Sequence, residues 1–399
     1  MSNLKETLKA HISEDRVVKM TSDMIRIESY PGIPQRETKV AQYIKDIFDA
    51  HDIPCELKEV EDGRCNVIAI LDSGNPGKTL MLNGHLDTVP PYGWEEACEP
   101  KIVDGILYGR GTCDDKGPTA GLIEAVLALK ASGALTQGKV VFTGVIDEEH
   151  KSLGTIDVIE SGIKADAAIV AERSFFEIRN CQRGLEWLKF TFTGKAVHGG
   201  YVHDGINAIS KANKFISALE EELAPKIFGR KHPALNEATV NIGVIKGGTQ
   251  PSTVAGDCEI TIDTRYLPYQ EYEDVIGEFQ ELIDKLAAED PQFKCEMSVC
   301  EESIMKEGYV HPPFEIPEDH PLVTMLSDVI ADVTEKETVI TYMKSWTDAG
   351  LLAKYANLPV VVLGPGGENP HAAPETVPIA DLYNIALVYA MAAVEFCHS

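Results

Sequence analysis

The chain has 399 residues, of which 44% are hydrophobic and 25% charged, and its formal net charge is -27. This length exceeds one ordinary domain, and the composition is typical of a globular protein with about two domains. The strong acidity argues against nucleic acid and anionic membranes as partners, because both require a basic surface.

The nine cysteines are scattered along the chain without a Cys-x-x-Cys pair. This pattern indicates reduced thiols rather than a disulfide framework or a thiolate zinc site, and Cys113 is interpreted as a packing residue. No segment approaches the roughly 18 or more apolar residues expected of a membrane span. The opening residues run directly into a charged, helix-like segment without a signal-peptide pattern, so we expect a cytoplasmic protein.

Helix-like and strand-like segments alternate in the first part of the chain. Residues 6–52 carry apolar side chains at helical spacing, and a segment rich in small residues and leucine, 118–131, predicts a buried helix. Three apolar runs predict buried strands, at 66–71, 80–84 and 140–146. This alternation favours a mixed, mainly parallel sheet with helices on both faces.

The pattern changes after residue 182. Residues 185–193 alternate apolar and polar side chains, which predicts a strand with one solvent-facing side. The next segments predict, in order, helix, strand, strand, helix and strand, over 205–223, 239–245, 258–266, 269–288 and 293–299. The order β-α-β-β-α-β is that of a ferredoxin-like unit. Further on, a strand at 360–363 and a helix at 380–396 resume the first pattern.

We therefore expect a larger α/β domain, residues 1–182 and 301–399, that contains an inserted α+β ferredoxin-like domain, residues 183–300. Polar groups follow the strand-like runs of the larger domain or open its buried helix: His85 with Asp87, Asp114, Asp147-Glu148-Glu149, Glu172 and His371. Open α/β sheets place their active sites beyond the carboxyl ends of the strands, so we expect these groups to lie close together. Histidines and carboxylates gathered in this way predict a site for two hydrolytic metal ions.

The residue types also predict a division of roles. We interpret His85 as a metal ligand and Asp87 as the residue that fixes the tautomer of its imidazole ring. The carboxylate of Asp114 can bridge two cations. Of the adjacent glutamates, Glu149 is expected to bind metal, while Glu148 takes a proton from the attacking water and passes it to the leaving amine.

Each group also has an ordinary interpretation when it is taken alone. His85 and Asp87 could form a polar turn, Asp114 could be a helix N-cap, and the acidic run at 147–149 could be an exposed loop. A histidine in a loop, such as His371, is usually not a ligand. A phosphate-binding loop is excluded, because Asp114 stands where that motif requires glycine and no Gly-Lys-Ser/Thr sequence occurs.

Taken together, the motifs resemble those of the co-catalytic zinc amidohydrolases, a family that includes acetylornithine deacetylase, succinyl-diaminopimelate desuccinylase, aminoacylase, carboxypeptidase G and related dipeptidases. The resemblance covers nearly the whole chain and lies in these residues: His85-Leu86-Asp87-Thr88-Val89-Pro90, Gly109-Arg110-Gly111 with Asp114, Lys116 and Gly117, Asp147-Glu148-Glu149, Glu172, and His371. It implies a zinc-aminopeptidase-like catalytic domain with an inserted lid domain. It also implies that the two divalent ions are zinc, with cobalt or manganese as compatible alternatives.

The resemblance further implies two ligand sets that share one residue. One ion would be bound by His85, Asp114 and Glu172, and the other by Asp114, Glu149 and His371. The peptide bond that follows Asp114 in the chain is expected to be cis.

In the inserted domain, His198 resembles the family's lid histidine, which would hydrogen-bond the oxyanion of the reaction. In dimeric members this histidine reaches the active site of the partner subunit, so a homodimer is implied. Arg265 resembles the arginine that grips a substrate carboxylate, although it could equally be a surface residue of a strand. Backbone N–H groups of Gly366 and Gly367 are expected to contribute to substrate binding.

The substrate is left open by two conflicting features. The loop 112–118 resembles the dipeptidase branch of the family, whereas Glu172, in place of aspartate, resembles the deacylase branch. Residues 251–254 also lack the Asn-x-x-Pro of many relatives, and His150 stands where glycine is usual. We expect hydrolysis of the amide of an N-acyl amino acid, with a dipeptidase, tripeptidase or carboxypeptidase as the alternative. An inactive metal-binding protein would require the loss of a ligand, and every expected ligand is present.

Overall fold

The computed structural model describes residues 2–399, and Met1, the first residue of the predicted larger domain, lies outside the described residues. The described chain divides into two compact units. Unit 1 contains the chain up to Asn180 together with Glu315–Met343 and Thr347–Ser399. Unit 2 contains Cys181–Phe314 and Lys344–Trp346.

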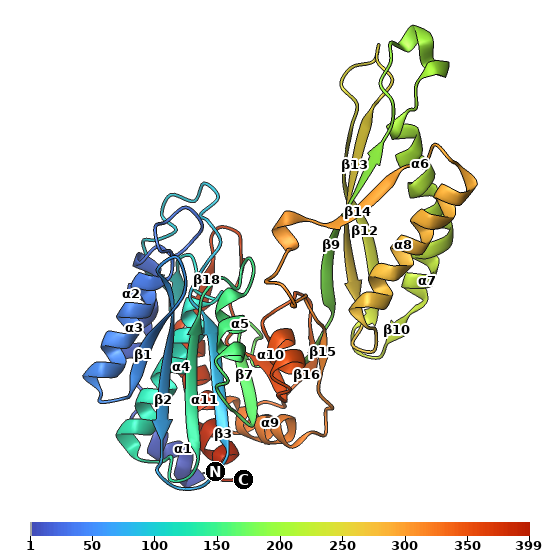
Figure 1. Ribbon diagram of the computed structural model, residues 1–399. Helices are drawn as coiled ribbons and strands as arrows, with labels where there is room; N and C mark the ends of the chain where they lie inside the picture. Colours follow the sequence, from blue (N-terminus) through green and yellow to red (C-terminus); the bar gives the residue numbers. More distant parts are fainter. Residues whose placement is uncertain (1) are drawn as a thin grey trace. The chain divides into compact units, whose positions relative to one another are not determined.

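A mixed sheet forms the centre of unit 1 (Figure 1). Its strand order is β1-β2-β6-β3-β7-β17-β8-β15, with β16 paired to β8. The bounds are Cys55–Glu61 (β1), Arg64–Asp72 (β2), Thr79–His85 (β3), Lys139–Val145 (β6), Ala167–Ala171 (β7), Ile178–Gln182 (β8), Phe314–Glu315 (β15), Ile340–Met343 (β16) and Val360–Leu363 (β17). The central strands β6, β3, β7 and β17 are parallel, and β1, β2 and β8 pair antiparallel at the sides. The predicted mixed sheet with a parallel centre is confirmed.

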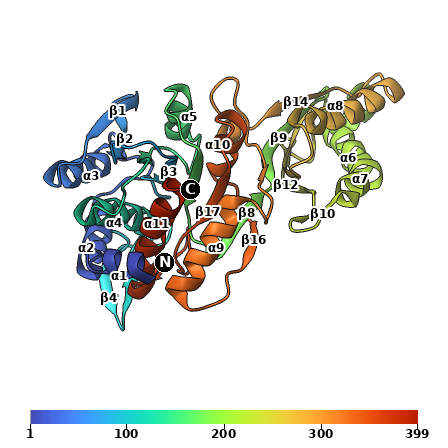
Figure 2. The same cartoon turned by 90° about the horizontal axis from the view of Figure 1, so that it is seen from below.

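Helices cover both faces of this sheet (Figure 2). α4 and α11 pack together on one face, and α5 and α10 lie on the other. The helices of unit 1 are Ser2–Lys9 (α1), Glu14–Arg26 (α2), Thr38–Ala50 (α3), Lys116–Ser132 (α4), Leu153–Glu160 (α5), Pro321–Thr334 (α9), Ala349–Tyr355 (α10) and Ile379–Cys397 (α11). The segment predicted as helical over 6–52 is thus three helices. Pro31, Gly32 and Pro34 lie in the break before α3, where proline and glycine disfavour a continuous helix.

The helix α11 is mostly apolar. It is long and apolar enough to cross a membrane by length and composition, so the prediction that no segment reaches that character is wrong. Most of its residues are buried inside unit 1, where it packs against α4, α9 and β3. A helix that is hydrophobic all round is also what the core of a large α/β unit requires.

A small three-stranded sheet links two distant loops of unit 1. It consists of β4 (Lys101–Val103), β5 (Ile106–Tyr108) and β18 (Thr376–Pro378), in the order β18-β5-β4. All its pairs are antiparallel. Through the pair β18–β5, the segment before α4 lies beside the segment before α11.

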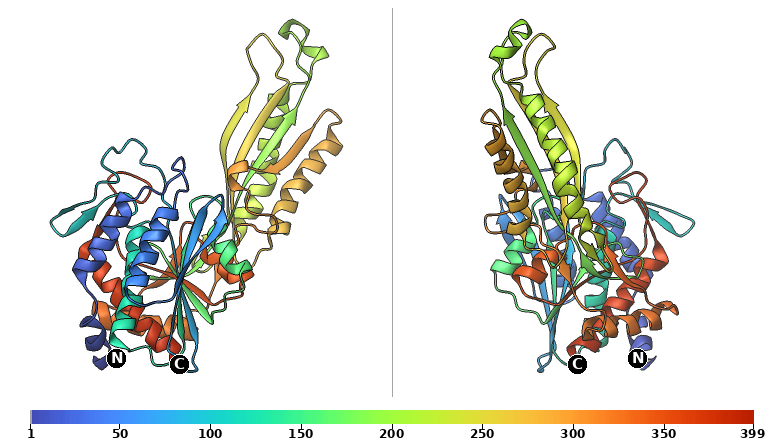
Figure 3. Two further views of the ribbon diagram at one scale, coloured as in Figure 1. Left: turned by 60° about the vertical axis from the view of Figure 1, so that its left-hand side comes forward. Right: turned by 90° about the vertical axis from the view of Figure 1, so that its right-hand side faces the viewer.

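Unit 2 is built on a four-stranded antiparallel sheet in the order β12-β13-β9-β14. Its helices lie on one face of this sheet (Figure 3, left) and enclose a cluster of phenylalanine rings formed by Phe190, Phe192, Phe215 and Phe279. The main elements are Gly184–Thr193 (β9), Ala208–Ala218 (α6), Ala224–Gly229 (α7), Thr239–Gly247 (β12), Asp257–Tyr266 (β13), Tyr272–Glu289 (α8) and Cys295–Val299 (β14). Short elements are Gly199–Asp204 (η1), Leu219–Leu223 (η2), Lys231–His232 (β10), Asn236–Glu237 (β11) and Glu301–Ser303 (η3). The chain order β9-α6-β12-β13-α8-β14 confirms the predicted ferredoxin-like arrangement.

Unit 2 extends beyond residue 300, where the sequence predicted its end. The hydroxyl of Ser303 donates to Glu186 at 2.5 Å, and the carbonyl of His311 accepts hydrogen bonds from the Leu185 backbone N–H and the Tyr266 hydroxyl. These contacts tie the segment after β14 to strands β9 and β13. No periodic pattern marks such a segment, so the sequence did not indicate which unit it joins.

The chain leaves and re-enters unit 1 at adjacent points. The Ile316 backbone N–H donates to the Asn180 carbonyl at 2.9 Å, and the Asn180 side chain donates to the Ile316 carbonyl at 2.8 Å. Both ends of the long insertion are therefore held together by reciprocal hydrogen bonds within unit 1.

Candidate metal centre

The strand ends of unit 1 bring the predicted ligands together. His85 is the last residue of β3, Glu149 follows β6, Glu172 follows β7, and His371 lies in the loop after β17. Asp114 comes from the loop that precedes α4. Because β3, β6, β7 and β17 are parallel, their carboxyl ends meet at the same edge of the sheet.

The carboxylate of Asp114 lies between two histidines. Its Oδ1 is 3.0 Å from Nε2 of His85, and its Oδ2 is 3.1 Å from Nε2 of His371. Glu172 approaches the first histidine, with Oε1 at 3.7 Å from Nε2, and Glu149 approaches the second, with Oε2 at 3.0 Å. These two groups are the two ligand sets that the resemblance implies, joined by one carboxylate. The peptide bond that follows Asp114 is cis, as expected.

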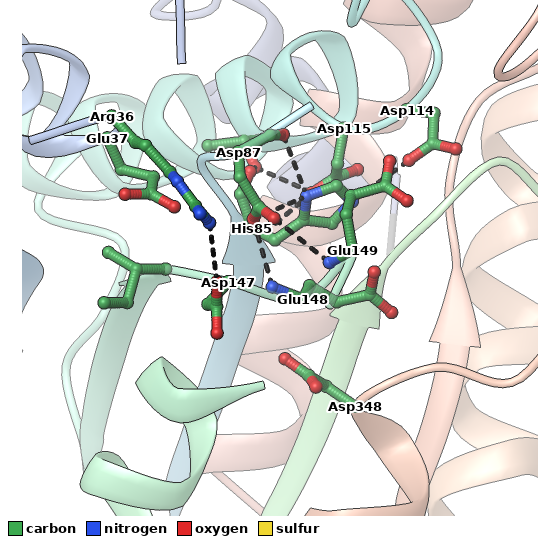
Figure 4. Close-up of polar contacts among 12 residues, drawn as sticks. Arg36, Glu37, His85, Asp87, Asp114, Asp115, Asp147, Glu148, Glu149 and Asp348 are labelled. Carbon is green, nitrogen blue, oxygen red and sulfur yellow. Dashed lines mark hydrogen bonds and ion pairs between the residues drawn. The ribbon is translucent and has the colours of Figure 1, made fainter. Parts of the chain in front are cut away.

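Asp87 is buried and supports both sides of this centre (Figure 4). Its backbone carbonyl lies 3.1 Å from Nδ1 of His85, and its carboxylate lies 3.4 Å from the same atom. A hydrogen on Nδ1 leaves the lone pair of Nε2 free to bind a metal ion. The carboxylate also accepts hydrogen bonds from the backbone N–H groups of Glu148 and Glu149, at 3.1 and 3.0 Å.

Glu148 lies beside the first ligand group rather than within the bridge. A carboxylate oxygen of Glu148, a ring nitrogen of His85 and a carboxylate oxygen of Glu172 all lie within 4.8 Å of one another. This position is compatible with a ligand and also with a base that reaches a water molecule bound there.

Asp348, just before α10, is a further acid near the centre, and Figure 4 shows it beside Glu148. It is buried, and its Oδ2 accepts a hydrogen bond of 2.6 Å from Thr155. Burial raises the pKa of Asp348 to about 6. Asp348 was not among the residues predicted from the sequence, where its signal is an acidic residue directly before a helix-like segment.

The charges of the centre favour cations. Removal from water raises the pKa of Glu148, Glu149 and Glu172. Burial also opposes ionisation of Asp114, but hydrogen bonds from His371 and His85 hold the pKa of that carboxyl well below its usual value. Carboxylates packed this closely repel one another unless a positive charge lies between them.

One further atom fits a metal ion. Oε1 of Glu149 is buried and has no hydrogen-bond partner among the described residues. A buried carboxylate oxygen without a partner is costly, and a bound cation would satisfy it. The oxygen and imidazole donors present are those of zinc, cobalt and manganese sites.

Arginines anchor the base of the acidic loop. Asp147 is buried and accepts hydrogen bonds from Arg64 at 2.7 Å and Arg36 at 3.0 Å. It has a positive φ of 71°, and its carbonyl accepts hydrogen bonds from the backbone N–H groups of residues 150–152. Asp147 therefore shapes the turn that carries the two glutamates.

The predicted substrate-binding glycines have structural contacts instead. The N–H of Gly366 donates to the Asp381 carboxylate at 3.1 Å, so a substrate would have to compete with Asp381 for this donor, and its role in substrate binding stays a prediction. Gly367 has a φ of 147°, and a Cβ at this position would lie 2.4 Å from Cβ of Cys113. The close approach of the Cys113 side chain explains this glycine without a substrate.

The two candidate residues of unit 2 make hydrogen bonds within that unit. His198 is exposed, and its Nδ1 accepts a hydrogen bond from the Gly200 backbone N–H at 3.1 Å. The ring hydrogen is thereby placed on Nε2, which can act as a donor. Arg265 is paired with Asp263, which accepts from Nε at 2.9 Å and from one terminal nitrogen at 2.8 Å.

Comparison with known proteins adds independent information. The sequence profile described as peptidase family M20/M25/M40 matches residues 81–395. The chain is 28% identical to N-formyl-4-amino-5-aminomethyl-2-methylpyrimidine deformylase of Halalkalibacterium halodurans, over 98% of this chain and 97% of that protein. It is 26% identical to a Staphylococcus aureus protein named as a probable succinyl-diaminopimelate desuccinylase, over 89% of this chain and 90% of that protein. The fold is similar to that of aminopeptidase PepT from Bacillus cereus, with a TM-score of 0.80, 22% identity, and coverage of 97% of this chain and 99% of the other.

Proposed function

The chain belongs to peptidase family M20/M25/M40, and from this premise we propose that it is a dinuclear zinc amidohydrolase that cleaves the amide of an N-acyl amino acid. As a family member it is a metal-dependent hydrolase that acts on amide or peptide bonds. The observation that carries the proposal is the position of Asp114, whose two carboxylate oxygens face different histidine–glutamate pairs.

The residues present fit two metal ions. One ion would be held by His85, Asp114 and Glu172, and the other by Asp114, Glu149 and His371. When bound, such ions lower the pKa of a water molecule and polarise a carbonyl oxygen.

Glu148 is proposed as the general base. Its carboxylate lies within reach of the first ligand group, as a group that accepts a proton from the attacking water requires. It would then deliver this proton to the nitrogen of the leaving amine. The hydrogen bonds from the Glu148 and Glu149 backbone to Asp87 fix the turn, so that the base and the adjacent ligand keep separate positions.

Unit 2 would supply contacts to the substrate. The Nε2–H of His198 is a suitable donor for an oxyanion, because Nδ1 is occupied by the Gly200 N–H. Arg265 could bind a substrate carboxylate, which would have to compete with Asp263 for the guanidinium group. A weak preference for a free carboxylate on the substrate would follow from this competition.

The curated relatives favour deacylation. The deformylase and the desuccinylase are both named for the removal of a small acyl group. The alternative is a dipeptidase, tripeptidase or carboxypeptidase on the same site, and the loop 112–118 is the feature that favours it. The similarity to PepT does not decide between them, because at this level of identity it concerns the fold alone.

A substrate panel tests the proposal. Metal-free protein would be reconstituted with zinc, cobalt or manganese and assayed on N-formyl, N-acetyl and N-succinyl amino acids, on an N-formyl aminomethylpyrimidine, and on dipeptides and tripeptides. We expect kcat/KM to be highest for an N-acyl amino acid. Turnover of peptides alone would refute deacylation and leave the peptidase alternative. Turnover of the pyrimidine alone would refute the proposal that the acylated amine is an amino acid.

We also propose a homodimer that forms through unit 2. The strand β12 lies at the end of the sheet order, and the side chains of Val244 and Ile245 on it are exposed. An edge strand with exposed apolar residues is a surface on which a second copy can extend the sheet. Light scattering after size exclusion gives the mass in solution and tests this proposal.

A further inference from the structure

A single buried carboxylate lies between two loops of the candidate metal centre. The side chain of Glu375 is fully buried, and its carboxylate accepts four hydrogen bonds. Oε2 accepts from Nη1 of Arg110 at 2.7 Å and from the backbone N–H of Gly111 at 2.9 Å. Oε1 accepts from the backbone N–H groups of Cys113 at 2.9 Å and Asp114 at 3.1 Å.

The backbone of Glu375 is equally fixed. Its carbonyl accepts a hydrogen bond from the N–H of Gly109 at 3.2 Å, and the next three residues form β18, which pairs with β5. Glu368 and Thr376 exchange backbone hydrogen bonds on either side of the turn that contains His371. The loop that carries His371 and the loop that carries Asp114 are thus joined by the side chain and backbone of one residue.

The arrangement of donors distinguishes this contact from an ordinary buried ion pair. An ion pair with Arg110 alone would add little to stability, because burial of the two charges offsets their attraction. Here three of the four donors are backbone N–H groups of residues 111–114, and they point at the carboxylate from one continuous loop. The contact therefore fixes the path of that loop rather than only neutralising a charge.

We propose that Glu375 is a positioning residue for both metal sites, which holds the loop before α4 so that Oδ1 of Asp114 faces His85 and Oδ2 faces His371. This inference rests on the proposed dinuclear function. It assigns to Glu375 no contact with substrate, and it predicts that loss of the carboxylate weakens both sites together, because the shared ligand is displaced.

Glu375→Gln is the informative substitution. The amide has one acceptor oxygen, which will face Arg110, since the opposite orientation would bring its NH2 group against the guanidinium. The NH2 group then faces the N–H groups of Cys113 and Asp114, and both lose their acceptor. The matched control is Glu124→Gln, which alters another fully buried glutamate that pairs with an arginine, Arg16, and accepts one backbone N–H.

The experiment measures zinc affinity and stoichiometry by chelator competition on metal-free protein, the absorption spectrum of the cobalt-substituted protein, and thermal stability. In Glu375→Gln we expect the affinity of both sites to fall by about 10–100-fold and the cobalt spectrum to change. In Glu124→Gln we expect a loss of thermal stability with wild-type affinity and spectrum. Glu375→Asp keeps the charge and withdraws it by one methylene, so it should also lower the zinc affinity of both sites. It tests the same proposal if the glutamine variant does not fold.

Wild-type affinity and spectrum in a folded Glu375 variant would overturn the inference, whatever its thermal stability. A wild-type protein that binds fewer than two ions would overturn the proposed function, and the inference with it. The two failures are distinguishable, because the first is seen in the variant and the second in the unaltered protein.

Discussion

Replacement of Asp87 by asparagine tests whether the buried Asp87 carboxylate orients the candidate metal centre. The two carboxylate oxygens of Asp87 hold the backbone N–H groups of Glu148 and Glu149 at 3.1 and 3.0 Å, and one oxygen also lies 3.4 Å from Nδ1 of His85. Asparagine offers one oxygen in place of two. One backbone N–H must therefore face an NH2 group and lose its acceptor.

The size of the effect follows from this count. One buried N–H without an acceptor costs about 1–3 kcal/mol, so the metal-free Asp87→Asn protein should lose that much free energy of unfolding. The same displacement moves the turn that carries Glu149 and loosens the ring of His85. Changes behind a metal ligand typically cost about 10–100-fold in metal affinity or activity.

Three measurements check this prediction: urea unfolding of the metal-free protein, zinc affinity by chelator competition, and kcat/KM at saturating zinc. We expect all three to fall in Asp87→Asn. A variant that loses stability but keeps wild-type zinc affinity and kcat/KM would refute the reasoning, because Asp87 would then hold the fold of the turn without orienting the centre.

Four further outcomes are expected. Glu148→Gln should keep its metal content and lose about 10²–10⁴-fold in kcat, and near wild-type turnover would show that another group is the base. Removal of metal by a chelator should lower the melting temperature and zinc should restore it, because an ion that binds only the native state stabilises it; an unchanged melting temperature would argue against a metal site. Burial and the charge of Arg265 lower the pKa of His311 to about 4, so the native state keeps this ring neutral. The contribution of this neutral ring to the free energy of unfolding is complete above pH ~6.5 and falls by up to about 3 kcal/mol as the pH drops towards 4. In urea unfolding, His311→Gln should lose less stability than the wild-type protein over this pH range. Val244→Lys on β12 should shift the protein from dimer to monomer in light scattering, with the melting temperature measured in parallel to show that the variant is folded; a dimer that persists would place the interface elsewhere.

The fold was largely predictable because its signals are local. Buried parallel strands appear as apolar runs, such as the one that ends at His85, and the alternation over 185–193 marks a strand with a wet face. The helix α11 was also predicted, but its long apolar character and the unit to which the segment after β14 belongs were not. A long, mostly apolar helix has a similar composition in a protein core and in a membrane, and the segment after β14 has no periodicity.

The residues that hold the ligand loops of the metal centre act through contacts between distant parts of the chain. The sequence placed Asp87 near His85, two positions away, but its hydrogen bonds to the 148–149 backbone cross 61 and 62 residues. Glu375 reaches the 111–114 loop across more than 260 residues. An acidic residue four positions after His371 was visible in the sequence, but nothing local distinguishes it from a surface glutamate. The hydrogen bond from the Gly366 N–H to Asp381, 15 residues further on, was likewise not visible in the sequence.

The hydrogen-bonded pair of Asn180 and Ile316 has a consequence for how such a protein can diversify. All the residues proposed for metal binding and proton transfer lie outside 181–314, while His198 and Arg265 lie inside this segment. The segment between the paired ends can therefore change in length or sequence while the metal ligands and the base keep their places. Substrate preference and reaction type could then change independently in evolution. Exchange of the insert between relatives would be a route to new substrates without a new metal centre.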